Sequence, residues 1–257
     1  MEQKERREYL IRYLLDEEPQ YQNIDIPEDE QEQKNLLRAL MNVRMPKMIS
    51  RSFLDVQDAY LQEEIRNTGI TDVNDLSPVK TDDRLYLWQG DITQLKADAI
   101  VNAANSQMLG CFQPLHGCID NIIHTKAGIQ LRLECARIMQ GQEEETGKAR
   151  ITSAYNLPSK YVIHTVGPIV QGRLTQKHEE LLASCYRSCL ELAEENNAES
   201  IAFCCISTGV FMFPNQRAAE IAVQTVKEWL NETGSHMKVI FNVFKDEDRK
   251  IYEELLD

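Results

Sequence analysis

The sequence predicts an α/β fold: a three-layer sandwich with a mixed, mostly parallel sheet, preceded by a helical N-terminal extension. From Arg84 onward, short strand-like segments alternate with longer segments of helical periodicity, which is the pattern of a sheet whose strands are joined by crossover helices. Before about Lys80, apolar residues recur at helical spacing instead. These two observations divide the chain into a helical part and an α/β part.

The composition excludes several classes of protein. At 257 residues and 42% hydrophobic content, the chain suits one large domain, or a core domain with an extension. The net charge of −13 disfavours non-specific binding to nucleic acid or to an anionic membrane. The first residues lack the apolar segment of a secretory signal. Seven cysteines without such a signal predict a cytoplasmic protein with free or metal-bound thiols.

Three helices are predicted in the N-terminal part. The first ends before Pro19, the second ends before Pro46, and the third ends near Gly69, since glycine is a favoured helix C-cap. Nothing in these helices has the composition of a catalytic site. Residues 1–80 are therefore interpreted as a helical extension that packs on the main domain, with residues 70–83 as a linker. The alternative is a separate protein-binding module.

The second domain, residues 84–257, is expected to hold the sheet. Six strands are predicted, at Leu85–Trp88, Ala99–Ala103, Ala149–Ala154, Tyr161–Val166, Ile201–Ile206 and Val239–Phe244. Helices are predicted between and after them, at Ile119–Met139, Gln176–Asn196, Asn215–Glu232 and Asp246–Leu256. In folds of this kind, ligands bind at the carboxyl ends of the strands. The loops with unusual composition begin at those ends, after Trp88, Val101 and Ile206.

The loop after the first strand reads Gly90-Asp91-Ile92-Thr93. Glycine permits a tight turn, and the carboxylate of Asp91 can accept a hydrogen bond from an exocyclic amine such as that of adenine. The alternative is a turn in which Asp91 caps the backbone.

The loop after the fifth strand, Ser207–Asn215, leads into a helix. Its Ser, Thr and Gly residues can present backbone N–H groups to phosphate oxygens near a helix N-terminus. It contains neither Lys nor Arg and lacks the Gly-Lys-Ser/Thr ending of a Walker loop. A diphosphate would have to be held mainly by backbone donors. The alternative is an ordinary strand-to-helix connection.

The stretch Ile100–Lys126 carries the densest chemistry of the chain. Cys111, His116 and Cys118 place two thiolates and one imidazole within eight residues. This ligand set suits zinc, and three protein ligands leave the fourth tetrahedral position for water or substrate. The alternative is a buried or fortuitous cluster.

Four motifs resemble the macrodomain family, whose members bind ADP-ribose: GDIT, IVNAANSQMLG, YVIHTVGP and ISTGVFMFP, in that order. The resemblance runs through residues 84–257 and implies an α/β/α macrodomain sandwich. The segment CFQPLHGC replaces the glycine-rich segment of common hydrolytic macrodomains. This replacement, with a helical extension, is similar to the zinc-dependent microbial branch. Members of that branch are protein-ADP-ribose hydrolases, often encoded with a sirtuin-type ADP-ribosyltransferase and a lipoyl-carrier protein.

The resemblance implies roles for residues near the metal ligands. Asn105 would orient the distal ribose, and Asn102 with Ala103 would position the nearby backbone. Asp120 would orient water, act as a base or help to hold the ribose. Its alternative role is a helix N-cap, for which Asp is well suited.

The resemblance also implies the residues that contact the rest of ADP-ribose. Asp91 and Ile92 match the family's adenine contacts. The residues implied for the diphosphate and its flanks are Ser207, Thr208, Gly209, Val210, Phe211 and Phe213. Asn242 and Phe244, at the end of the last strand, would touch adenine or its ribose.

The function that follows is a zinc-dependent hydrolase that removes mono-ADP-ribose from modified proteins and so reverses the modification. An ester to Asp or Glu is the favoured target, because a carboxylate leaves readily. The expected partners are ADP-ribose and a mono-ADP-ribosylated protein such as a lipoyl-carrier protein, with neither nucleic acid nor membrane. The alternative is a non-catalytic reader of ADP-ribose with a structural zinc.

Overall fold

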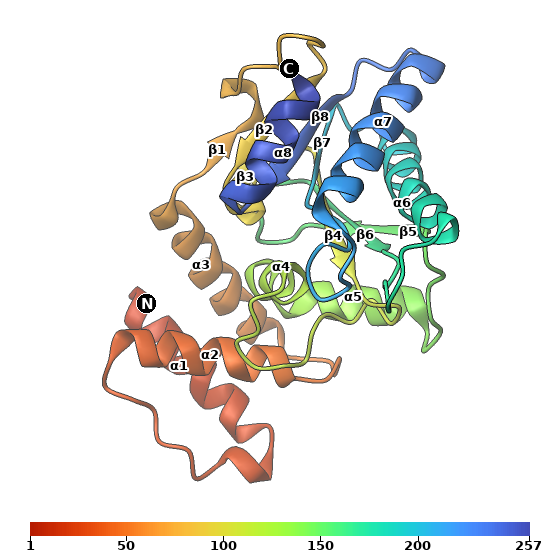
Figure 1. Ribbon diagram of the computed structural model, residues 1–257. Helices are drawn as coiled ribbons and strands as arrows, with labels where there is room; N and C mark the ends of the chain where they lie inside the picture. Colours follow the sequence, from red (N-terminus) through yellow and green to blue (C-terminus); the bar gives the residue numbers. More distant parts are fainter.

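The computed structural model describes residues 1–257 and places a six-stranded sheet at the centre of the C-terminal part (Figure 1). Its strands lie in the order β2 (Leu85–Gln89), β8 (Lys238–Val243), β7 (Ser200–Phe203), β4 (Ala99–Ala104), β6 (Tyr161–Val166) and β5 (Ala149–Ser153). Neighbouring strands are parallel except β5, which runs antiparallel to β6. Inner strands such as β7 are buried along their whole length, as expected for a sheet covered on both faces.

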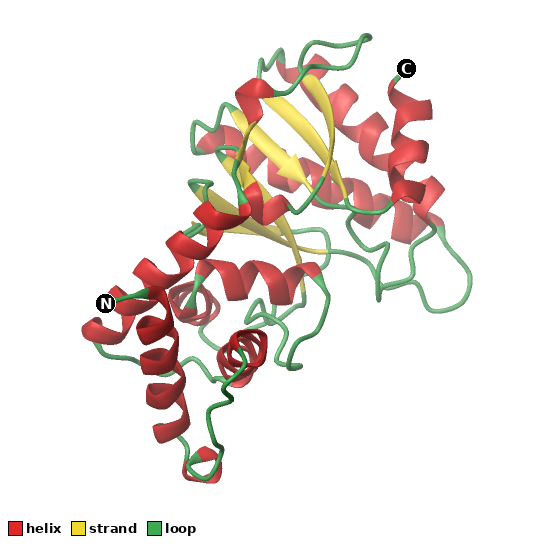
Figure 2. Ribbon diagram, turned by 90° about the vertical axis from the view of Figure 1, so that its left-hand side faces the viewer, coloured by secondary structure: helices red, strands yellow, loops and turns green.

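Helices cover both faces of the sheet, which confirms the predicted three-layer sandwich (Figure 2). One layer contains α4 (Ile119–Ala127) and α5 (Ile129–Met139). The other contains α6 (Gln176–Glu195), α7 (Asn215–Thr233) and α8 (Asp246–Leu256). The carboxyl ends of parallel strands lie at the same edge of a sheet. The loops after β2, β4, β7 and β8 therefore all lie at that edge.

Three helices form the N-terminal part, as predicted: α1 (Gln3–Asp16), α2 (Glu30–Val43) and α3 (Arg51–Thr68), with the 3₁₀ turn η1 (Pro19–Tyr21) after α1. They enclose a hydrophobic core of their own, which Ile129 of α5 completes. At its other end, α3 places Ile65 in the main core. The N-terminal helices and the α/β part therefore contribute residues to the same hydrophobic cores, and the helices pack directly on the α/β part.

The segment 70–83, predicted as a linker, is partly built into the fold. Strand β1 (Thr71–Asp72) pairs in parallel with β3 (Leu95–Lys96), and the 3₁₀ turn η2 (Val73–Asp75) buries Val73 in the main core. Another 3₁₀ turn, η3 (Ile92–Gln94), precedes β3. Strands of two residues have too little periodicity to be recognised in a sequence.

The prediction of one helix over residues 119–139 was wrong, because the helix is interrupted at Gly128. This glycine has φ +98° and ψ 174°, and it separates α4 from α5. Residues with a side chain rarely adopt this conformation. The surroundings also lack room, since a Cβ atom there would lie 2.7 Å from Nε2 of Gln57 and 2.8 Å from Oε1 of Gln130.

Gly128→Ala is expected to destabilise the protein by about 3 kcal/mol or more. Gln57 cannot move freely, because it accepts from the Ile129 N–H and donates to Gln130. Gly69→Ala is the matched control: Gly69 has a similar backbone, φ 94° and ψ 150°, but open space around its Cβ position. It should cost about 1–2 kcal/mol. Urea unfolding of both variants gives the two values. Equal losses would mean that the side chains around Gly128 yield without cost.

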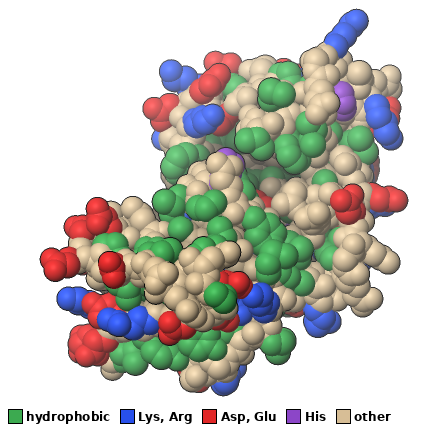
Figure 3. Space-filling view, turned by 90° about the horizontal axis from the view of Figure 1, so that it is seen from below, with side chains coloured by type: hydrophobic (Ala, Val, Ile, Leu, Met, Phe, Trp, Pro, Cys, Tyr) green, Lys and Arg blue, Asp and Glu red, His purple; other side chains and the backbone are tan.

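No helix has the length and apolar character needed to span a membrane. Seen from the side of the N-terminal helices, hydrophobic side chains gather across the middle of the face, around a hollow (Figure 3). Lys and Arg on this face lie among Asp and Glu, mainly at its margins. This view contains no continuous basic patch of the kind that binds nucleic acid.

Candidate active site

The predicted site residues come together at the carboxyl edge of the parallel strands. Asp91 follows β2, Asn105 follows β4, and Phe244 follows β8. The loop that begins after β7 carries Ser207, and residues 111–118 lie between β4 and α4. Stretches far apart in the sequence therefore surround one region, because parallel strands end on the same side.

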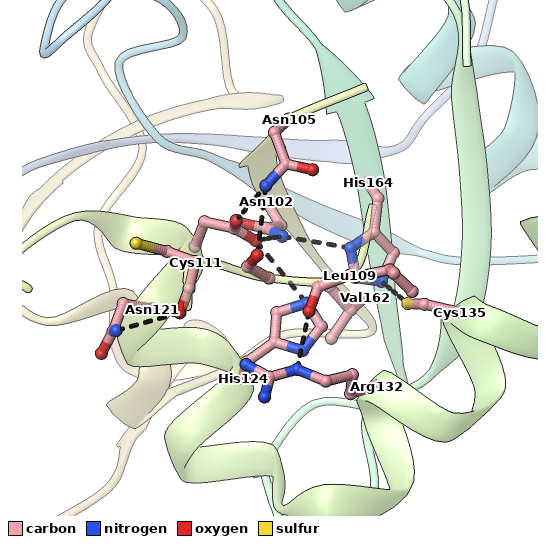
Figure 4. A network of polar contacts seen from close by, with 12 residues as sticks. Asn102, Asn105, Leu109, Cys111, Asn121, His124, Arg132, Cys135, Val162 and His164 are labelled. Carbon is pink, nitrogen blue, oxygen red and sulfur yellow. Dashed lines mark hydrogen bonds and ion pairs between the residues drawn. The ribbon is translucent and has the colours of Figure 1, made fainter. Parts of the chain in front are cut away.

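Two carboxamides hold one buried carboxylate at this edge (Figure 4). Asn102 Nδ2 donates to Oδ1 of Asp120 at 2.8 Å, and Asn105 Nδ2 lies 3.4 Å from Oδ2 of the same group. Asn105 Nδ2 also donates to the Gly110 carbonyl at 3.1 Å. The Oδ1 atoms of Asn102 and Asn105 are buried without a protein partner. Because buried polar atoms are normally hydrogen-bonded, these oxygens are acceptors available to water or a ligand.

Asp120 is not the N-cap of its helix. Cys118 occupies that position, and its Sγ accepts from the backbone N–H of Asn121 at 3.4 Å. The carboxylate of Asp120 faces the two asparagines instead. Burial raises the pKa of Asp120 to about 6, while the hydrogen bond from Asn102 and the charge of Arg132 oppose that rise. The helix-cap alternative is therefore excluded, and a carboxyl group that titrates near neutrality suits proton transfer.

His164 fixes Asn102 from the neighbouring strand. The two residues are paired across β4 and β6, and His164 Nδ1 lies 3.1 Å from Asn102 Nδ2, while Nε2 lies 3.0 Å from Oγ1 of Thr152. Burial lowers the pKa of His164 to about 4, so the ring is neutral and Nδ1 accepts from Asn102. The contact of His164 with Asn102 depends on β4 and β6 being neighbours in the sheet, which the sequence alone does not show.

The residues Cys111, His116 and Cys118 converge as the sequence suggested. They lie on the Cys-His-Cys loop, residues 111–118, and are half-buried, and their ligand atoms all lie within 4.8 Å of one another. Sγ of Cys111 is 3.6 Å from Nδ1 of His116. Two sulfurs and one nitrogen at this spacing fit zinc with one coordination position left open. Asn105 Nδ2 donates to the carbonyl of Gly110, the residue that precedes Cys111.

The loop after β7 offers unpaired backbone donors. The N–H groups of Ser207, Gly209, Val210 and Phe211 make no hydrogen bond within the chain. Ser207 has a left-handed backbone, φ 65°, and its buried Oγ has no protein partner. A row of free N–H groups in such a turn forms a concave site for anions. Phe213, expected beside the diphosphate, is only 1% exposed and belongs to the core.

Four residues were predicted to contact the nucleoside. Asp91 caps η3, since its Oδ1 accepts from the N–H and hydroxyl of Thr93. Ile92 is 1% exposed, which leaves only its backbone for a ligand. Asn242 is buried and donates to the Gly90 carbonyl at 2.9 Å, so its side chain joins β8 to the turn after β2. Phe244, by contrast, is 76% exposed at the end of β8 and free to cover a flat ring.

The sequence and structure are similar to those of known proteins. The model of the Macro domain family matches residues 101–222. A Treponema medium protein named protein-ADP-ribose hydrolase is 60% identical over the full length of both chains. A Staphylococcus aureus protein of the same name is 52% identical, and the alignment covers 98% of this chain and 95% of that protein.

Among solved structures, the Trypanosoma brucei macrodomain in complex with ADP-ribose is 31% identical with a TM-score of 0.67. The match covers 85% of this chain and 95% of the trypanosomal one. These similarities extend over nearly the whole chain. The chain therefore belongs to the macro domain family.

Proposed function

We propose that this protein is a hydrolase that removes ADP-ribose from modified proteins. The observation that carries the proposal is the buried carboxylate of Asp120, which Asn102 and Asn105 hold beside the Cys-His-Cys loop. A protein that only bound ADP-ribose would need neither an oriented carboxyl group nor an incomplete metal site. The names of the bacterial relatives at 52–60% identity support this function.

The bond to be cleaved joins the anomeric carbon of the distal ribose to an oxygen of the modified side chain. Hydrolysis transfers the hydroxyl of water to that carbon and returns a proton to the departing oxygen. In the proposed mechanism, Oδ1 of Asn105 accepts a hydrogen bond from a ribose hydroxyl; this atom has no partner within the protein, which supports that role. Asp120, whose pKa lies near 6, orients water and accepts its proton. The backbone donors after β7 hold the diphosphate.

The finer part of the proposal is zinc dependence. Cys111, His116 and Cys118 would hold the ion and leave one position open. When bound, zinc supplies Lewis acidity that polarises a ribose hydroxyl or lowers the pKa of water. The same loop begins one residue after Gly110, which Asn105 contacts, so metal ligands and ribose contacts lie on one continuous segment.

The preferred substrate is an ester of ADP-ribose with Asp or Glu, because a carboxylate is a better leaving group than a serine alkoxide. A mono-ADP-ribosylated lipoyl-carrier protein is the first candidate partner. The test measures release of ADP-ribose from proteins modified on Asp/Glu and on Ser, before and after treatment with a chelator. We expect ADP-ribose to be released from the ester substrate, the release to stop when the metal is chelated, and the release to return when zinc is added. Tight ADP-ribose binding without release from either substrate would instead identify a reader.

Gly209→Glu is expected to weaken ADP-ribose binding at least 100-fold, because the new carboxylate would stand against a diphosphate. Gly209→Ala is the matched control. A Cβ atom at Gly209 meets nothing within 4 Å, and its backbone is not left-handed, so the alanine variant should fold normally and bind within about tenfold of wild type. Titration calorimetry gives both affinities. Unchanged affinity in Gly209→Glu would place the phosphates elsewhere.

A further inference from the structure

Helix α2 lies against the Cys-His-Cys loop, and its polar side chains hold the loop backbone. Arg38 Nη2 donates to the carbonyl of His116 at 2.7 Å and to Oδ1 of Asn121 at 2.9 Å. The first bond fixes the backbone of a predicted metal ligand directly. Arg38 is in the middle of α2 and far from its caps, so these bonds do not serve the helix itself.

Asn42, one turn further along α2, holds the residue before that ligand. Its Oδ1 accepts from the backbone N–H of Leu115 at 3.1 Å, and its Nδ2 donates to Thr125 on α4 at 2.9 Å. Leu115 has a left-handed backbone, φ 57°, which is uncommon for a residue with a branched side chain. Its side chain is 43% exposed and offers little packing to hold this conformation, so the bond from Asn42 helps to fix it.

Asn121 forms hydrogen bonds with the first half of the loop. It is fully buried at the beginning of α4, and its Nδ2 donates to the carbonyls of Cys111 at 3.3 Å and Gln113 at 3.0 Å. Its Oδ1 accepts from Arg38. Arg38 therefore orients a side chain that holds the first half of the loop, while it binds the second half itself.

Arg132 of α5 ties the end of α2 to Leu109, which precedes the loop by two residues; Figure 4 shows its contact with Leu109. Its Nη1 donates to the carbonyls of Met41 and Asn42, and its Nε donates to the Leu109 carbonyl at 2.7 Å. Its guanidinium lies 4.3 Å from the centre of the Phe112 ring, where a cation is attracted by the aromatic face. A shift of α2 would thus be transmitted to both ends of the loop.

We infer that Arg38 and Asn42 are positioning residues that set the geometry of the Cys-His-Cys loop. The N-terminal helices are then a working part of the active site, because they supply the frame on which the ligands are held. The expected effect of these two residues on zinc affinity rests on the proposed function. Their expected effect on how well residues 111–118 are ordered does not. Partners that orient ligating residues commonly change metal affinity by 10–100-fold when they are removed.

Arg38→Met tests the inference, with Lys34→Met as the matched control. Lys34 lies one turn earlier on α2 and pairs with Glu30 and Glu64, so its loss removes a charge from the same helix without a contact to the loop. In metal-free protein, hydrogen exchange of the amides of residues 111–118 should rise in Arg38→Met and stay unchanged in Lys34→Met. Melting temperatures identify any general loss of stability.

Zinc affinity, measured by competition with a chelator, should fall about tenfold or more in Arg38→Met and remain at the wild-type value in Lys34→Met. Asn42→Leu should behave like Arg38→Met, while Asn42→Asp, which keeps the acceptor for the Leu115 N–H, should recover most of the affinity. Unchanged exchange and unchanged zinc affinity in Arg38→Met and Asn42→Leu would overturn the inference. If wild type binds no zinc, the proposed metal fails, and the exchange measurement alone decides whether α2 orders the loop.

Discussion

Asn105→Ala is expected to lower the rate of ADP-ribose release by about 100-fold or more, while ADP-ribose binding weakens by tenfold at most. The substitution removes the buried, unpaired Oδ1 and the Nδ2 that contacts Gly110 and Asp120. The distal ribose would lose its orientation at the reacting carbon. The donors after β7 would still hold the diphosphate, which is why most of the ground-state affinity should remain.

A control variant separates this effect from a loss of structure. Asn156 is also buried and donates to the Ala127 carbonyl at 2.9 Å and to Asp58 at 2.8 Å, but it makes no contact with the site residues. Asn156→Ala should lower the melting temperature and leave the release rate near that of wild type. Equal rates in Asn105→Ala and wild type would contradict the orienting role.

Asp120→Asn completes the test, because it keeps the shape of the side chain and removes its charge. If the carboxylate orients water, the rate of ADP-ribose release should fall as steeply as in Asn105→Ala, while the free energy of unfolding stays nearly unchanged. The helix should persist in either case, since Cys118 provides the cap. A variant that loses stability without losing rate would assign Asp120 to the fold alone.

The sequence was sufficient for the larger elements of the fold. Apolar periodicity and helix-ending residues such as Gly69 predicted the N-terminal helices within a few residues of their bounds. The break at Gly128 was missed, because the apolar pattern continues from α4 into α5 and a single glycine is tolerated in many helices. The break is seen only in the structure, where Gly128 adopts φ +98° and ψ 174°.

The candidate site was partly predictable for a related reason. Loop composition identified the Cys-His-Cys loop and the loop after β7, since local sequence determines which donors each contains. Interactions that depend on sheet order were not accessible, such as His164 opposite Asn102 across β4 and β6. The orientation of Asn242 was equally hidden, because a polar residue near a strand end can face either a ligand or, as here, a neighbouring turn.

The contacts of α2 with the loop were the least predictable. Arg38 and Asn42 precede the residues they hold by more than 70 positions, and both read as ordinary polar positions on an amphipathic helix. Nothing in the sequence of α2 alone distinguishes a solvated polar face from one that binds a loop. That distinction arises only when the N-terminal helices pack on α4 and α5.

Cys118→Ser is expected to reduce bound zinc from about one ion per chain to a small fraction, and to lower release of ADP-ribose by about 100-fold or more. Serine keeps the size of the side chain but replaces a thiolate ligand with a hydroxyl that remains protonated. It is also a favoured helix N-cap, so the bond that Cys118 accepts from the Asn121 N–H can be retained. Loss of metal in this variant would not reflect loss of α4.

Cys189→Ala is the matched control for the cysteine substitution, because Cys189 is fully buried on α6, in the layer on the opposite face of the sheet. Removing its thiol should lower stability by about 1 kcal/mol and leave zinc and release unchanged. Elemental analysis and the release assay are run on both variants and on chelated wild type. Undiminished zinc in Cys118→Ser would remove this residue from the metal site. Zinc loss with full release would make the ion structural, and the hydrolase would then rely on Asn105 and Asp120 alone.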